Sequence, residues 1–416
     1  MTFPQILSLR EQNELHDAWL AYRLEHVLPK LMQRTEIDLW IVLAREYNED
    51  PVMFSLLPAT SLNASRLTGL VYALDDAGRV DCYSITSKKA KRYAPFYEAV
   101  WAKDDETQYA CLARLIAEKD PRRIGTDVSE TFALADGLSK TLYDQLVAAL
   151  DEPYRQRLVG AEALAVGWLE TRTPLELAAY PELNRIAHGL IAEAFSKHVI
   201  VPGVTTTKDL EYHMIQRAVD MGLGFWFHYH VDIQRHQDLE ADPDKTTVMP
   251  GDLLHCDVGI CYKGLKTDTQ RLAYVLRQGE TDAPAGLQAL LRSANRFQDI
   301  VAANFVEGRT GNEILAKSLA EAKAEGLDAT LYNHPIGVHG HAAGPTMGLW
   351  DHQEGVPGRG DYPLYADTCH ALELNTKMPV PEWDGKVVQA GLEQTVAFTA
   401  GEVVYLDGRQ TVLILV

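Results

Sequence analysis

The sequence predicts an α/β protein with two domains, and three observations along the chain lead to this prediction. A chain of 416 residues exceeds the usual size of one hydrophobic core. Residues 1–160 alternate short apolar runs with amphipathic helical patterns. Residues 161–416 begin with long helical patterns and end in strand-rich sequence. We therefore expect one domain over residues 1–160 and a second over residues 161–416.

The first domain is predicted to be compact and to mix helices with strands. Apolar residues at helical spacing predict helices, and continuous or alternating apolar runs predict strands. The expected helices cover residues 12–34, 107–118 and 132–150, and the expected strands cover residues 39–44, 67–74 and 80–85, with a turn at 75–78.

The second domain is predicted to begin with helices and to continue as antiparallel sheet. A helical pattern over residues 158–197 is interrupted near Thr173 and Pro174. Threonines 205–207 offer an N-cap for a helix over residues 209–221. Further expected elements are a hairpin over residues 251–275, helices over 285–306 and 312–325, and closing strands.

Composition excludes several classes of protein. Hydrophobic residues make up 46% and charged residues 23% of the chain, as in ordinary globular proteins. The net charge of 39 − 58 = −19 argues against binding to nucleic acid or to an anionic membrane. The N-terminus does not resemble a signal peptide, and apolar runs of about 18 residues, as a membrane-spanning helix needs, do not occur. Five scattered cysteines favour reduced thiols, so we expect a cytoplasmic protein.

The hairpin over residues 251–275 carries the first candidate metal ligands. Alternation along a strand places His255, Asp257 and Gly259 on one face. If Ile260 pairs with Leu265, Asp257 lies opposite Asp268, and two facing carboxylates repel each other unless a cation or a proton lies between them. His255 is expected to support the ligands from behind or to pack in the core.

Two later segments add further candidates. Residues 333–354 contain four histidines among glycines, which favours a metal or acid–base site: His334, His339, His341 and His352. Glu373 and Glu393 lie within apolar, strand-like runs, where a carboxylate is costly unless it is paired or bound to a metal. Four carboxylates and one imidazole suit two divalent ions.

Together these residues resemble the pita-bread metallopeptidases, the family of methionine aminopeptidase, aminopeptidase P and prolidase. The pattern D-x-G-x-x-Y-x-G-x-x-x-D-x-x-R is complete from Asp257 through Asp268 to Arg271, and G-H-x-x-G is present from Gly340 to Gly344. Residues 1–160 resemble a creatinase-type N-terminal domain, which favours the Xaa-Pro aminopeptidase and Xaa-Pro dipeptidase branch. The implied fold is α/β (α+β), with that domain followed by a pita-bread catalytic domain.

The resemblance implies an activity, a cofactor and a partner. The chain is expected to be a metal-dependent hydrolase that cleaves the Xaa-Pro bond at the N-terminus of short proline-containing peptides, and to form a homodimer. Two divalent ions, manganese first and cobalt, zinc or iron otherwise, would supply a bridging hydroxide. The implied metal ligands are Asp257, Asp268, His341, Glu373 and Glu393.

Three catalytic side chains are also implied. Glu373 would move a proton, His352 would stabilise the intermediate, and a histidine before Asp257 would contact the substrate. For the last role we prefer His236, with His228 and His230 as alternatives.

The chain departs from the family pattern at three places, which leaves alternatives open. The spacing from His341 to His352 is long, which keeps His339 as a rival ligand. Gly391 stands where an arginine is common, and Gln394 stands where an aspartate is common. One alternative is a hydrolase or lyase acting on a small molecule at the same two-metal site. The other is a catalytically dead pita-bread domain that binds proteins.

Overall fold

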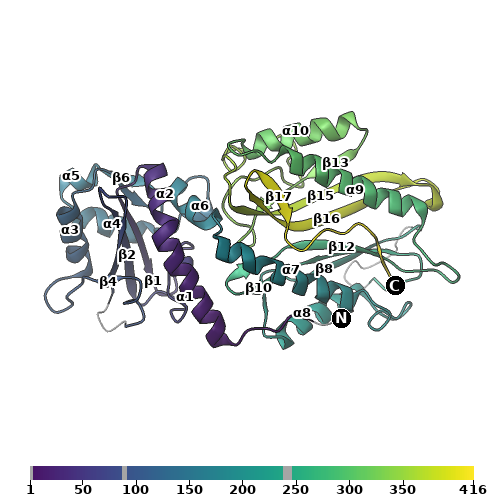
Figure 1. Ribbon diagram of the computed structural model, residues 1–416, viewed down its shortest axis with the longest axis horizontal. Coiled ribbons are helices and arrows are strands. Elements are labelled where there is room, and N and C mark those ends of the chain that lie inside the picture. Colours follow the sequence, from purple (N-terminus) through teal and green to yellow (C-terminus); the bar gives the residue numbers. More distant parts are fainter. Residues whose placement is uncertain (1–2, 87–90, 238–245) are drawn as a thin grey trace. The chain divides into compact units, whose positions relative to one another are not determined.

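The computed structural model describes residues 3–86, 91–237 and 246–416 and divides the chain into two compact units (Figure 1). One unit is Leu7–Thr173, and the other joins Pro174–Val416 with the N-terminal segment up to Ile6. The division therefore lies after Thr173, whereas the sequence placed it near residue 160. The difference arises because helix α6 (Glu162–Glu170) buries its apolar side chains in the first unit, where Trp168 donates a hydrogen bond to Ser55.

The first unit is a six-stranded sheet covered by helices, in the strand order β4-β3-β2-β1-β5-β6. Its strands are β1 (Leu39–Arg45), β2 (Leu67–Leu74), β3 (Val80–Ile85), β4 (Glu98–Ala99), β5 (Ile124–Thr126) and β6 (Leu158–Gly160). Its other helices are α1 (Leu9–His26), α2 (Leu28–Thr35), α3 (Gln108–Lys119), α4 (Lys140–Ala149) and the short α5 (Glu152–Arg155).

Two predicted helices of this unit differ from the structure. The helix expected over residues 12–34 is broken at Val27, because Pro29 fits the first turn of a new helix but not a helix interior. The helix expected over residues 132–150 begins only at Lys140, where the Ser139 hydroxyl accepts the Leu142 N–H as an N-cap. The hairpin of β2 and β3 is confirmed, with Leu74 paired to Val80.

The second unit contains a nine-stranded sheet and a three-stranded sheet. The main path of the large sheet is β13-β15-β16-β12-β9-β8, and the small sheet is β11-β10-β7. The strands are β7 (Gly224–Phe225), β8 (His230–Gln234), β9 (Leu253–Val258), β10 (Ile260–Tyr262), β11 (Leu265–Lys266), β12 (Thr269–Tyr274), β13 (Asp328–Leu331), β14 (His334–Pro335), β15 (Thr368–Val380), β16 (Lys386–Thr399), β17 (Glu402–Tyr405) and β18 (Ile414–Leu415). The helices are α7 (Pro174–Ala194), α8 (Thr207–Asp220), α9 (Ala285–Asn304) and α10 (Gly311–Ala324).

Helices α9 and α10 lie along one side of β15 and β16 (Figure 1). Leu372, Leu374 and Leu392 point to this side and are buried in its hydrophobic core. Side chains alternate along a strand, so Glu373, between Leu372 and Leu374, and Glu393, next to Leu392, point to the opposite face. The burial of three leucines therefore fixes which way two glutamates face.

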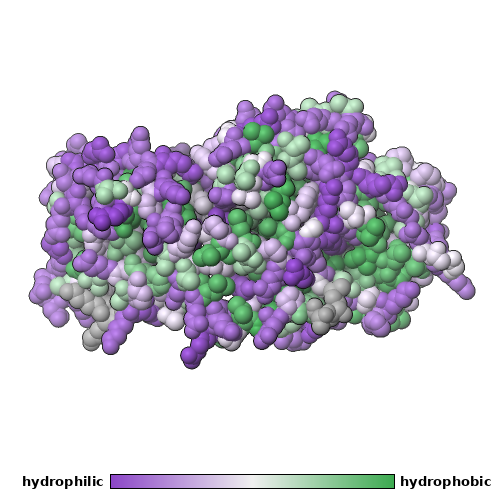
Figure 2. Space-filling view, viewed as in Figure 1, coloured by the Kyte–Doolittle hydropathy of each residue, from purple (hydrophilic) through white to green (hydrophobic). Residues whose placement is uncertain are grey.

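The surface in the view of Figure 2 is mostly hydrophilic, with hydrophobic residues gathered in patches on the Pro174–Val416 unit. Exposed apolar side chains of this unit include Val201, Val204 and Val412. Among the described residues, all helices are too short or too polar to span a membrane. In this view the hydrophobic patches lie among hydrophilic residues.

Candidate metal centre

The hairpin of β9 and β12 brings Asp257 and Asp268 to the same face of the sheet. Its turn is Lys263-Gly264, where φ is 55° and 76°, as a two-residue type I′ turn requires. Tyr262 therefore pairs with Leu265, and Asp257 pairs with Gln270. The expected pairing of Ile260 with Leu265, and of Asp257 with Asp268, is wrong by two residues.

A shift of two residues preserves the faces of the strands, because side chains alternate with a period of two. Asp268 consequently lies diagonal to Asp257 on the same face, within reach of a shared ion.

Four adjacent strands place three carboxylates and one amide in a row. Asp257 on β9 lies opposite Gln270 on β12, Gln270 opposite Glu393 on β16, and Glu393 opposite Glu373 on β15. Glu393 is 1% exposed. Two glutamates directly opposite each other destabilise a sheet unless a cation compensates their charge.

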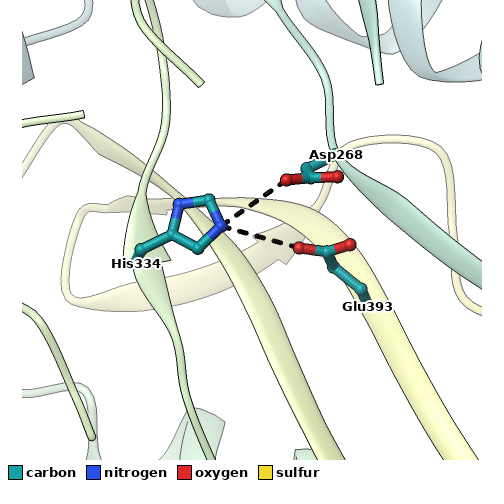
Figure 3. Close-up of side chains that lie close together, drawn as sticks. All are labelled: Asp268, His334 and Glu393. Carbon is teal, nitrogen blue, oxygen red and sulfur yellow. Dashed lines mark ion pairs between the residues drawn. The ribbon is translucent and has the colours of Figure 1, made fainter. Parts of the chain in front are cut away.

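His334 on β14 completes the group (Figure 3). Its Nε2 atom points between Asp268 Oδ2, at 3.5 Å, and Glu393 Oε1, at 3.7 Å. Its Nδ1 atom lies 2.9 Å from the carbonyl oxygen of Pro335, which can only accept, so Nδ1 carries the proton. Nε2 therefore offers a lone pair toward the two carboxylates, as a metal-binding imidazole does.

The histidine expected at this position was His341, with His339 as a rival, and the structure brings neither to the carboxylates. His341 is exposed and its ring packs against the edge of the His334 ring, at 4.6 Å between centroids. The reason is pairing: β14 sits beside β15, with His334 opposite Ala371, two residues from Glu373. His341 follows in the loop after this short strand.

The group has the properties of a cation site. Five buried atoms that face it have no hydrogen-bond partner: Asp257 Oδ1, Asp268 Oδ1, His334 Nε2, Glu393 Oε1 and Glu393 Oε2. Orphaned buried polar atoms are rare in folded proteins, and a metal ion satisfies them. The donor atoms form two sets of three that share Glu393: Asp268, His334 and Glu393, and Asp257, Glu373 and Glu393.

The pKa values of the carboxyl groups also indicate a cation site. Burial raises the pKa of Asp268 to about 7, and burial together with the Asp268 charge raises those of Asp257 and Glu393. Burial and the charge of Asp257 raise the pKa of Glu373. Without a cation, burial and mutual repulsion therefore disfavour the ionised forms of these acids. The site therefore fits divalent ions bound by oxygen atoms and one nitrogen.

Two predicted catalytic histidines lie elsewhere. His236 lies two residues beyond the end of β8, where its Nε2 is 2.8 Å from Asp384 and its ring stacks on Trp383. His352 is at the surface, paired at 3.0 Å with the neighbouring Asp351. The structure places neither at the carboxylates. His230, an alternative to His236, is directly opposite Asp257 in the sheet and 64% of its side chain is exposed.

Residues behind the carboxylates form a hydrogen-bonded chain. Asp232 Oδ2 lies 2.8 Å from His255 Nδ1, and His255 Nε2 lies 2.9 Å from Gln270 Oε1. The amide nitrogen of Gln270 donates to Glu373 at 2.6 Å and to Asp257 at 3.4 Å. Burial alone would lower the pKa of His255, but the Asp232 charge raises it to about 9. Gln270 escaped the sequence reasoning, although its place two residues after Asp268 put it on the same strand face.

An aromatic wall, formed by Trp226, Phe227 and His341, stands beside the carboxylates. A Cβ atom on Gly259 would lie 2.3 Å from the Trp226 indole nitrogen and 2.5 Å from Phe227, and one on Gly340 would lie 2.3 Å from Trp226. The rings of Trp226 and His341 are 5.1 Å apart. Gly259, directly after β9, and Gly340, in the loop after β14, thus leave room for Trp226 to pack closely against both segments.

Fold and site together define a metallohydrolase-type protein, with a helix-covered antiparallel sheet that presents buried carboxylates and an imidazole. The sequence profile of metallopeptidase family M24 matches residues 181–400, more than half of the chain, and the chain belongs to this family. The pita-bread fold expected from the sequence is confirmed.

Solved structures share this fold over both units. The X-Pro aminopeptidase from Thermotoga maritima matches with a TM-score of 0.66 and 14% identity, over 93% of this chain and 100% of its own. The Xaa-Pro dipeptidase from Bacillus anthracis matches with 0.61 and 17%, over 98% and 100%. The N-terminal domain of FACT complex subunit SPT16 from chickpea matches with 0.58 and 12%, over 98% of each. Among curated proteins, none matches the sequence closely enough to count as a relative.

Proposed function

We propose that this protein is a two-metal exopeptidase that cleaves the Xaa-Pro bond at the N-terminus of short peptides. The observation that carries the proposal is the convergence of His334 with the four carboxylates, whose orphaned atoms face one another inside an M24 fold. The whole-chain likeness to structures named X-Pro aminopeptidase and Xaa-Pro dipeptidase supports the proline-directed branch.

The proposed ligands are Asp257, Asp268, His334, Glu373 and Glu393, with Glu393 shared between two divalent ions. Such ions polarise a scissile carbonyl and lower the pKa of water to near neutrality. Mn²⁺ is the first ion to test, because oxygen-rich sites suit it.

Protein side chains supply the proton transfer and the substrate contacts. Glu373, held by the Gln270 amide, accepts the proton of the attacking water. His230 faces the site from the strand next to Asp257 and contacts the peptide. Although part of His341 is exposed, burial of its ring against Trp226 and His334 lowers its pKa to about 4. The neutral imidazole can then donate a hydrogen bond to the developing charge. The aromatic wall offers an apolar surface for a proline ring.

Hydrolysis of three peptides tests this proposal. Chelated protein and protein reloaded with Mn²⁺ are compared on Ala-Pro, Ala-Pro-Ala and Ala-Ala. We expect cleavage only before proline and only after reloading, and the ratio of Ala-Pro to Ala-Pro-Ala turnover separates a dipeptidase from an aminopeptidase. Bound metal without any cleavage would contradict the peptidase assignment and favour a small-molecule substrate or a protein-binding role.

A further inference from the structure

Gln270 occupies an unusual position for an uncharged side chain. It stands between Asp257 and Glu393 in the row across the sheet, and its amide nitrogen donates to the carboxylates of Asp257 and Glu373. An amide has a donor end and an acceptor end of nearly the same shape. If the amide were reversed, its oxygen would face carboxylate oxygens and repel them. The site therefore depends on which end of the amide points inward.

His255 contacts the other end of this amide. Asp232 only accepts hydrogen bonds when ionised, so the 2.8 Å contact places a proton on His255 Nδ1. His255 Nε2 lies 2.9 Å from Gln270 Oε1, and it donates to this oxygen when the ring carries both protons. Because the carboxylates of Asp257 and Glu373 only accept, the amide nitrogen faces them and the amide oxygen faces His255.

Gly391 provides the space for this contact. A Cβ atom at position 391 would lie 2.9 Å from His255 Nε2 and 3.0 Å from Gln270 Oε1. Any larger residue would displace the two atoms that form the hydrogen bond. The family pattern leads to an arginine at this position, and here the imidazole and the amide fill the place that its side chain would need.

We propose that Gln270 is a positioning residue of the metal centre, held by His255 and Asp232 in the space left by Gly391, and that it fixes Asp257 and Glu373 for cation binding. The inference rests on the proposed function, since it concerns the same ions. Its physical basis is that hydrogen bonds from behind orient ligand carboxylates before the cation arrives, and loss of such partners lowers metal affinity by about 10- to 100-fold in other proteins.

The test measures the dissociation constants of Mn²⁺ and Co²⁺ by calorimetry, and the visible absorption of bound Co²⁺, which reports ligand geometry. Gln270→Leu and His255→Leu should each weaken binding by about 10- to 100-fold and change the Co²⁺ spectrum. His255→Gln keeps a donor near the Nε2 position and should restore most of the affinity. Gly391→Ala leaves every polar group in place and should weaken binding in the same direction. Gln234→Leu, which removes bonds to the Gln389 backbone on β16, is the matched control.

Wild-type affinity and spectrum in a folded Gln270→Leu protein would overturn the proposal. If that variant does not fold, the other three variants decide. The proposal would be overturned if His255→Leu, His255→Gln and Gly391→Ala all bound Mn²⁺ and Co²⁺ with the same affinity as one another. A purely structural role would lower the stability of all variants, the Gln234→Leu control included, without changing the spectrum of bound Co²⁺. Failure of the wild-type protein to bind either ion would overturn the proposed function together with this inference.

Discussion

Asp268→Asn should stabilise the metal-free protein while it removes metal binding. Asp268 is 4% exposed, and its Oδ1 atom has no hydrogen-bond partner. Burial raises its pKa from the ordinary 3.8 to about 7. Because this pKa is raised in the folded state, the group's contribution to stability is complete below pH 3.8 and is lost as the pH rises through about 7. An asparagine side chain does not ionise in this pH range, so it avoids the cost of a buried charge.

The size of the effect follows from these values. At 1.36 kcal/mol per pKa unit, the rise from 3.8 to about 7 corresponds to about 4 kcal/mol above pH 7. Local relaxation reduces this figure, so we expect the variant to exceed the metal-free wild type by about 2–4 kcal/mol at pH 8 and by at most about 2 kcal/mol at pH 5. The same variant should lose bound Mn²⁺, because the carboxylate charge is gone.

The assay is urea unfolding of the chelated protein, monitored by hydrogen exchange in peptides from β12, β15 and β16. This readout gives the stability of the unit that contains Asp268 separately from that of the N-terminal unit. Asp328→Asn, an exposed change at the start of β13, is the control, because an exposed substitution usually changes stability by at most about 0.5 kcal/mol. A variant that is less stable than the metal-free wild type at pH 8 would refute the reasoning. So would a stability gain that is equal at pH 5 and pH 8.

Two further changes test other parts of the structure. Calorimetry should show that His334→Ala reduces Mn²⁺ affinity at least 10-fold, whereas His341→Ala leaves it within about threefold of the wild type. A larger loss of affinity in His341→Ala than in His334→Ala would indicate that His341 is the ligand. In the N-terminal unit, Asp127 accepts the indole N–H of Trp40 and burial raises its pKa, as burial raises that of its neighbour Asp50 to about 6. Asp127→Asn should therefore stabilise this unit at pH 8, and less at pH 5, in urea titrations, and a loss of stability at pH 8 would contradict the direction of the pKa shifts.

The sequence allowed the architecture and four of the five clustered side chains to be predicted. Alternation of apolar and polar residues is a local property, so the shared face of Asp257 and Asp268 survived an error of two residues in strand register. Glu373 and Glu393 were identifiable because each interrupts an apolar run whose leucines fill the core. Burial of the neighbours determines where such a residue points.

The histidine could not be chosen from the motif alone. Both His334-Pro-Ile-Gly337 and His341-Ala-Ala-Gly344 fit the pattern H-x-x-G, and the preceding glycine favoured the second. Only the pairing of β14 with β15, a contact between distant parts of the chain, separates them.

The prediction of which histidine faces the substrate differs from the structure for a related reason. His236 was preferred because it is near Asp257 along the chain, whereas the pairing of β8 with β9 places His230 opposite that aspartate. Distance along the chain does not measure distance across a sheet, because β8 runs antiparallel to β9 and carries its last residues away from the site.

The missing side chain at Gly391 makes three positions mutually dependent. A larger residue at 391 is compatible only with a smaller or repositioned pair at 255 and 270, and loss of His255 alone leaves a gap beside an amide oxygen that has lost its partner. Effects at touching positions are not additive. Through evolution or protein engineering, these positions should therefore change together, so that single exchanges pass through a worse intermediate and the combined exchange recovers what each one alone loses.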